Sequence, residues 1–146
     1  MHAAIRWISL TVALFLAAAG GSACAGLAAK GEAETAVVSF HGMLDAERYS
    51  EIYGGTDELF KNATPEAQFT ESLQAIHRKL GVVVSTAQTN FYSRDQVGTN
   101  AGSCISVTYK TVFALGPATE SFHWRVVDGK VQLVGYNIQS SLLTTR

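Results

Sequence analysis

The feature that most constrains this chain is a change in the spacing of its apolar residues at Gly81. Before Gly81 the apolar residues recur every three or four positions, which is the period of one face of a helix. After Gly81 they alternate with polar residues, which is the period of a half-buried strand. Helices followed by a run of antiparallel strands are typical of the α+β class. A length of 146 residues favours one domain with one core.

Four helical segments are expected before Gly81. They cover residues 33–44, 49–53, 56–60 and 64–80. Gly54-Gly55 is expected to end the second helix and Gly81 the last, because glycine terminates helices without steric strain. Thr56 and Thr64 are expected to cap the third and fourth helices through their hydroxyl groups. The apolar faces of these helices should pack on one face of a sheet.

Four strands are expected after Gly81. They cover residues 82–92, 105–113, 122–126 and 131–139, with a loop over 93–103. Asp128-Gly129 is the strongest hairpin signal in the chain. A two-residue loop at this point pairs Val127 with Lys130 and Trp124 with Leu133.

This register divides the strands into an inner face, which meets the helices, and an outer face. The inner face is expected to hold Ile105, Val107, Tyr109, Phe122, Trp124, Val126, Val131, Leu133 and Gly135. The outer face is mostly polar and has an apolar end, formed by Val134, Tyr136 and Ile138. Such an end indicates a surface for a homodimer or for a larger assembly.

Residues 1–25 have the organisation of a secretory signal peptide. Arg6 supplies the positive start, residues 7–19 form the apolar run, and small residues fill 20–25. The apolar run is shorter than the about 20 residues that a membrane-spanning helix needs. Cleavage after Ala25 is one expectation. The alternative is a lipobox over residues 21–24, in which Cys24 becomes a lipidated first residue.

The predicted organisation is therefore a signal peptide (1–25), a short linker (26–31), one α+β domain (32–140) and a tail (141–146). The protein is expected to be exported to the periplasm or the extracellular space. Contact with a membrane is expected only through the signal peptide or a lipid anchor on Cys24.

Composition and missing motifs exclude several classes of function. Eleven basic and 12 acidic residues give a net charge of −1, which does not favour nucleic-acid binding. Two cysteines do not make a disulfide scaffold, and no Cys/His cluster has the spacing of a zinc site. The sequence has no nucleophile elbow, phosphate-binding loop or dinucleotide motif. We therefore expect neither a cofactor nor a metal.

Residues 36–53 and residues 122–138 resemble segments of known proteins. The first runs from Ala36-Val37-Val38-Ser39-Phe40 to Tyr53, and the second from Phe122-His123-Trp124 to Asn137-Ile138. They resemble small secreted bacterial proteins of unknown function with the cystatin-like, cone-shaped fold of nuclear transport factor two. The resemblance implies N-terminal helices packed on a curved four-stranded antiparallel sheet. It also implies an apolar pocket and a dimer, without implying a particular activity.

Folds of this kind include ketosteroid-isomerase-like enzymes, which place a carboxylate base and a tyrosine in an apolar cone. Glu120, close to a predicted turn, is the only acid near the inner strand face, and we expect no carboxylate base. His77 follows Ile76 on the apolar helix face and is the best single candidate for a base. The candidate pocket residues are Tyr49, Tyr53, His77, Tyr109 and Trp124.

The sequence thus favours a non-catalytic module that binds a small apolar ligand or another protein. One alternative is a small isomerase- or dehydratase-like enzyme that uses His77 or a tyrosine as its acid or base. The other alternative is a structural subunit of an envelope assembly.

Overall fold

The computed structural model describes residues 21–96 and 102–144 and confirms the α+β class. The helices are α1 (Gly21–Asp45), α2 (Tyr49–Gly54), α3 (Glu58–Ala63), α4 (Glu66–Leu80) and α5 (Ser141–Thr144). The strands are β1 (Val83–Gln96), β2 (Gly102–Phe113), β3 (Gly116–Val127) and β4 (Lys130–Gln139). The switch from helices to strands lies at Gly81, as the spacing predicts.

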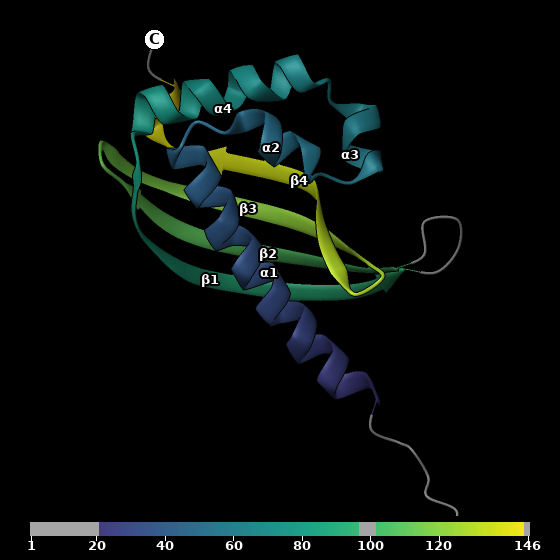
Figure 1. Ribbon diagram of the computed structural model, residues 1–146. Coiled ribbons are helices and arrows are strands. Elements are labelled where there is room, and N and C mark those ends of the chain that lie inside the picture. The colour runs from purple at the N-terminus through teal and green to yellow at the C-terminus, as the bar shows by residue number, and fades with distance from the viewer. Residues whose placement is uncertain (1–20, 97–101, 145–146) are drawn as a thin grey trace, which may run out of the picture.

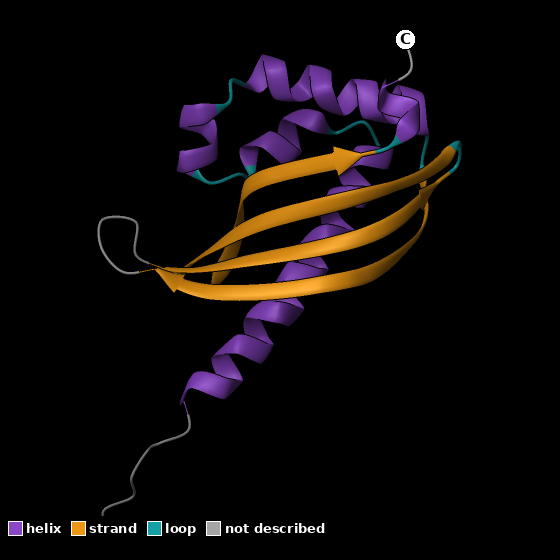
Figure 2. Ribbon diagram, turned by 180° about the vertical axis from the view of Figure 1, so that it is seen from behind, coloured by secondary structure: helices purple, strands orange, loops and turns teal. Residues whose placement is uncertain are grey.

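The four strands form one antiparallel sheet in the order β1-β2-β3-β4. The sheet curves around α1, which crosses its inner face, while α2, α3 and α4 gather on the β4 side (Figure 1). From behind, no described helix covers the outer face of the sheet (Figure 2). One layer of helices on one face of the sheet is therefore the architecture of the described residues.

The core lies between α1, α4 and the inner face of the sheet. The predicted helix positions Val37, Phe40 and Leu44 are buried there. So are the strand positions Ile105, Val107, Tyr109, Phe122, Trp124 and Leu133, as expected for the inner face. Burial of these apolar side chains is the main driving force for this packing.

The β3–β4 hairpin has the predicted turn and the predicted register. Asp128 and Gly129 both have positive φ, of 50° and 75°, which fits a type I′ turn. Val127 pairs with Lys130, and Trp124 pairs with Leu133.

Beyond Leu133 the register of β4 shifts by one residue, and this shift corrects the predicted outer face. Trp124 pairs with Leu133, whereas His123 pairs with Gly135, so β4 carries an additional residue here. Because strand side chains alternate between faces, one additional residue reverses the faces of everything that follows. Tyr136 and Ile138 therefore pack against the core and are not part of an apolar outer surface. The predicted interface of Val134, Tyr136 and Ile138 was wrong in this respect.

The start of α3 is capped by Asp57 and not by Thr56. The Asp57 carboxylate accepts a hydrogen bond of 2.8 Å from the backbone N–H of Leu59. Helix α4 has no side-chain cap and begins after Pro65, so Thr64 was also wrongly predicted as a cap.

Asp57 also ties the α2–α3 connection to the sheet. Its other oxygen, Oδ2, lies 2.9 Å from Nε and 2.7 Å from Nη2 of Arg125. The backbone N–H of Asp57 donates to the carbonyl of Leu133. Asp57 is 1% exposed and the Arg125 side chain 19%, so β3, β4 and α3 meet at a partly buried ion pair.

At both ends of the domain, helical structure covers residues for which no helix was expected. Helix α1 begins at Gly21 and includes residues 26–31, the predicted linker, while residues 141–144 of the predicted tail form α5. Most of the predicted signal peptide, residues 1–20, lies outside the described residues. Among the helices that the structure describes, none is long and apolar enough to cross a membrane.

Candidate functional site

A carboxylate lies in the middle of the apolar core. Glu120, on β3, is 0% exposed, and three side chains from three other elements bind it. Oε2 lies 2.8 Å from Nε2 of His41 on α1 and accepts a hydrogen bond from Thr111 on β2. Oε1 accepts a 2.6 Å hydrogen bond from the hydroxyl of Tyr136 on β4. We call Glu120, His41, Thr111 and Tyr136 the Glu120 cluster.

Aromatic rings enclose the Glu120 cluster. Phe40 contacts Phe122 and Tyr136, with ring centroids 5.1 and 4.8 Å apart, and Phe122 lies 5.8 Å from the His41 ring. Burial raises the pKa of Tyr136 well above its usual value of 10.0. The negative charge of Glu120 and its hydrogen bond raise this pKa further. Tyr136 therefore remains a neutral hydrogen-bond donor over the physiological range.

Sequence analysis missed this cluster, although Glu120 and His41 each carry a signal. Glu120 shares the two-residue period of Phe122 and Trp124, so it belongs to the inner face. His41 lies four residues after Val37, on the buried face of the same helix. Tyr136 could not be found this way, because the register shift before it reverses its face.

A cleft of about 300 Å³ adjoins Tyr136 between the helices and β4. We call it the α4–β4 cleft, and it is lined by Phe60, Thr64, Gln68, Phe69, Ser72, Leu73, Ile76, Tyr136, Asn137 and Ile138. Three of these residues are aromatic, and the rings of Phe60 and Phe69 pack edge to face 4.9 Å apart. Apolar walls with a few polar groups are typical of small-ligand sites.

The lining of the α4–β4 cleft contains no charged side chain. Besides Tyr136, the polar side chains of the lining are the hydroxyls of Thr64 and Ser72 and the amides of Gln68 and Asn137. A site with this lining favours an uncharged ligand, because a buried ion without a partner loses its hydration at high cost. Glu120 itself is closed off by its partners, so it fixes the Tyr136 wall and does not face the cleft.

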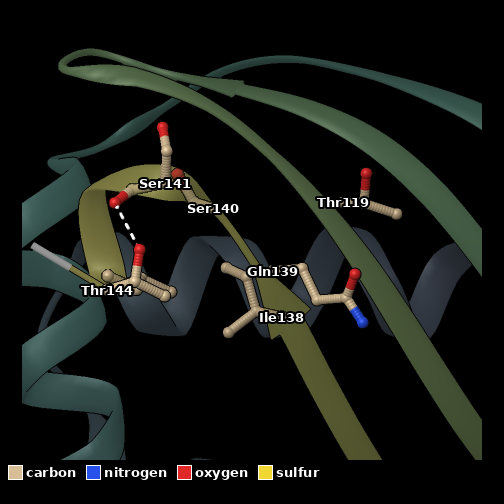
Figure 3. Close-up of a pocket in the computed structure, with 7 residues that line it drawn as sticks. Thr119, Ile138, Gln139, Ser140, Ser141 and Thr144 are labelled. Carbon is tan, nitrogen blue, oxygen red and sulfur yellow. Dashed lines mark hydrogen bonds between the residues drawn. The ribbon is translucent and has the colours of Figure 1, made fainter.

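Two further hollows are weaker candidates. A pocket of about 140 Å³ lies between α1, α2 and the β3–β4 hairpin, and Trp124 and Leu133 contribute to its wall. It is smaller than most ligand sites. A groove at the C-terminal end of β4 contains hydroxyl groups from Thr119, Ser140, Ser141 and Thr144 (Figure 3). Thr144 donates to the carbonyl of Ser141, and Ser140 donates to that of Pro117 on β3, so two of these hydroxyls already bind carbonyl groups of the chain.

The five predicted pocket residues lie in different parts of the domain. Tyr53 donates to the carbonyl of Thr64 and packs near Phe60 and Phe69, beside the α4–β4 cleft. Trp124 lines the smaller pocket, and its indole nitrogen has no acceptor among the described residues.

The other three predicted pocket residues, Tyr49, Tyr109 and His77, line neither of these two hollows. Tyr49 is buried on α2, and its burial raises its pKa. Tyr109 is buried on β2, where its hydroxyl lies 3.4 Å from the Gln88 side chain. His77 lies 3.5 Å from a carboxylate oxygen of the exposed Glu47. The structure therefore does not assemble these side chains into one site.

Within the described residues, no three His, Cys, Asp or Glu side chains are grouped as metal ligands. The Glu120 cluster supplies only one carboxylate and one imidazole.

Residues 36–136 match a family model described as a protein of unknown function, DUF4019. The match covers most of the chain. The chain belongs to this family. Its matched segment begins in α1 and ends at Tyr136, so it contains the Glu120 cluster and most of the residues that line the α4–β4 cleft. No curated protein matches the chain.

Proposed function

We propose that this protein is a non-catalytic binding module and that the α4–β4 cleft is its binding site. The observation that carries the proposal is the cleft of about 300 Å³, with aromatic walls and an uncharged lining. Its Tyr136 wall is fixed by a buried carboxylate, so this part of the site is formed before a ligand arrives. The ligand is small, or is a small part of a larger partner, and it is uncharged where it enters the cleft.

The proposal includes the fold family and the location. The helices and the curved four-stranded sheet agree with the resemblance to the nuclear transport factor two-like superfamily. The charge, apolar run and small residues of 1–25 support export to the periplasm or extracellular space, with Cys24 as the alternative lipid anchor.

Native mass spectrometry of the protein purified from its own host tests the binding site. We expect the wild-type chain to retain a non-covalent molecule, and Ser72→Phe to lose it by filling the cleft. Ser72 suits this test because its hydroxyl only donates to Gln68 within α4. Ser85→Phe on β1 is the matched control and should retain the molecule. A wild-type chain that carries no additional mass contradicts the proposal.

A second candidate is an acid–base enzyme, which the Glu120 cluster favours. A carboxylate, an imidazole and a phenol within hydrogen-bond distance are the groups that proton transfer uses. The full burial of Glu120 is the reason that we place this second. The enzyme candidate would be established if the wild-type protein converts the retained molecule and Glu120→Gln binds this molecule without converting it.

A further inference from the structure

The α4–β4 cleft runs along an edge of the sheet. β4 is the last strand in the sheet order, and among the described residues β3 is the only strand that neighbours it. Alternate residues of such a strand direct their N–H and C=O groups away from the sheet. Three consecutive β4 residues, Tyr136, Asn137 and Ile138, line the cleft. Backbone hydrogen-bonding groups of the edge are therefore part of the cleft wall.

The chain itself already pairs with one part of this edge. Thr56 forms a parallel bridge with Leu133, and the N–H of Asp57 donates to the Leu133 carbonyl at 2.9 Å. Beyond this bridge, no other described segment forms a backbone hydrogen bond with Gly135–Gln139 from outside the sheet. The edge thus accepts an extended segment at Leu133 and remains available where the cleft begins.

Both edges of the sheet combine a regular stretch with a register shift. β1 has two register shifts, between Val83 and Ser85 and between Gln88 and Asn90, and it pairs with β2 residue by residue from Asn90 to Gln96. Irregularities of this kind disfavour the addition of another strand. From Gly135 to Gln139, β4 pairs with β3 residue by residue and has no shift. A regular edge beside an apolar cleft is the arrangement to which extended peptides add as a strand.

We propose that the α4–β4 cleft binds an extended, uncharged peptide segment of a partner protein, which adds to the β4 edge as a further strand. This inference rests on the proposed function, because it names the ligand of the same cleft. The backbone of the segment pairs with Tyr136–Ile138, so about three residues take part. Its side chains alternate, and those on the helix side pack against Phe60 and Phe69.

Capped tripeptides test the inference directly. The probes are acetyl-Xaa-Ala-Xaa-amides in which both Xaa are Val, Leu or Phe, each compared with versions methylated on one backbone nitrogen. We expect binding to shift the backbone amide NMR signals of residues 135–139 and not those of 86–92 on the opposite edge. Methylation of the nitrogen that faces β4 should weaken binding about tenfold, because it removes a hydrogen bond and adds a clash. Ser72→Phe should abolish the shifts, and Ser85→Phe should keep them.

The outcomes separate this inference from the proposed function. Binding that no methylation weakens overturns strand addition and leaves the cleft as a binding site. Strand addition is also overturned, and the cleft remains a binding site, when no tripeptide binds but the protein purified from its host retains a non-peptide molecule. A concentration-dependent dimer that Ser72→Phe abolishes assigns the cleft to a second copy and overturns a separate partner. Absence of both tripeptide binding and retained mass overturns both proposals.

Discussion

At the scale of single residues, the unusual feature is a carboxylate at the centre of an aromatic core. Glu120 has no exposed surface and retains hydrogen bonds from Thr111 and Tyr136 and a contact with His41. Removal of a carboxylate from water is costly, and its partners offset that cost only while all of them are present. Each substitution in the Glu120 cluster should therefore have a larger effect than the same change at the surface.

Glu120→Gln tests this expectation. The amide nitrogen of glutamine only donates, so one of the two positions at which Glu120 accepts hydrogen bonds is lost together with the negative charge. We expect the free energy of unfolding to fall by about 3 kcal/mol. Urea denaturation followed by circular dichroism measures it. Glu58→Gln is the matched control, since the Glu58 side chain is 78% exposed, and its effect should be close to zero. Equal effects at the two positions would contradict the role of the cluster.

Tyr136→Phe should change the alkaline stability. The pKa of Tyr136 is raised in the folded state, so the unfolded chain loses this proton first as the pH rises through about 10. Stability from the neutral phenol is therefore complete below pH 10 and declines above it. Tyr136→Phe should reduce the slope of stability against pH above 10, as measured by urea denaturation at several pH values.

Part of that slope should remain in the variant, because burial also raises the pKa of Tyr49 and of Tyr109. Tyr92→Phe is the control, since Tyr92 is 57% exposed. An unchanged slope in Tyr136→Phe would contradict the assigned pKa direction.

At the scale of elements, the chain holds its helices on the sheet through a few specific links. The ion pair of Asp57 with Arg125 joins the start of α3 to β3, and the Thr56 bridge joins the same loop to β4. These links also fix one end of the α4–β4 cleft, because Phe60 of α3 lines it. Loss of the ion pair should loosen the cleft as well as the fold.

Arg125→Met should lower the free energy of unfolding by about 3 kcal/mol, because it leaves the buried Asp57 carboxylate without its cation. Asp57→Ala leaves no unpaired carboxylate but removes the cap of α3, so it should still cost about 1 kcal/mol. Chemical denaturation of both variants measures the difference. Arg48→Met is the control, because both Arg48 and its partner Glu51 are 55% exposed. No loss in Asp57→Ala would argue against its role as the cap of α3, and no loss in Arg125→Met would argue against the ion pair.

At the scale of the whole molecule, the two parts of α1 differ in how they contact the sheet. Its C-terminal part carries core residues and His41, while its N-terminal part extends past the edge of the sheet (Figure 1). Leu27 is 73% exposed, and Ala33 is the first buried residue among the side chains that the structure describes from residue 27 onward. The domain should therefore not depend on residues 1–25, the predicted signal peptide.

A chain that begins at Gly26 should unfold with the same free energy as the full chain, within about 0.5 kcal/mol. Thermal and urea denaturation of the two chains provide the comparison. A loss of several kcal/mol would show that residues 1–25 belong to the folded domain, against the predicted organisation. The intact mass of the protein from its host then distinguishes cleavage after Ala25 from a lipidated Cys24.

The sequence by itself determined the order of the elements, the hairpin at Asp128-Gly129 and most of the core. These features depend on local spacing and on the conformations that glycine allows, so they are readable along the chain. Only the tertiary structure decided the Glu120 cluster, whose His41 and Glu120 lie 79 positions apart. The register shift before Gly135 decided that Tyr136 and Ile138 face inward, and the helix packing created the cleft beside them. Contacts between distant segments depend on how all elements pack together, which local periodicity does not encode.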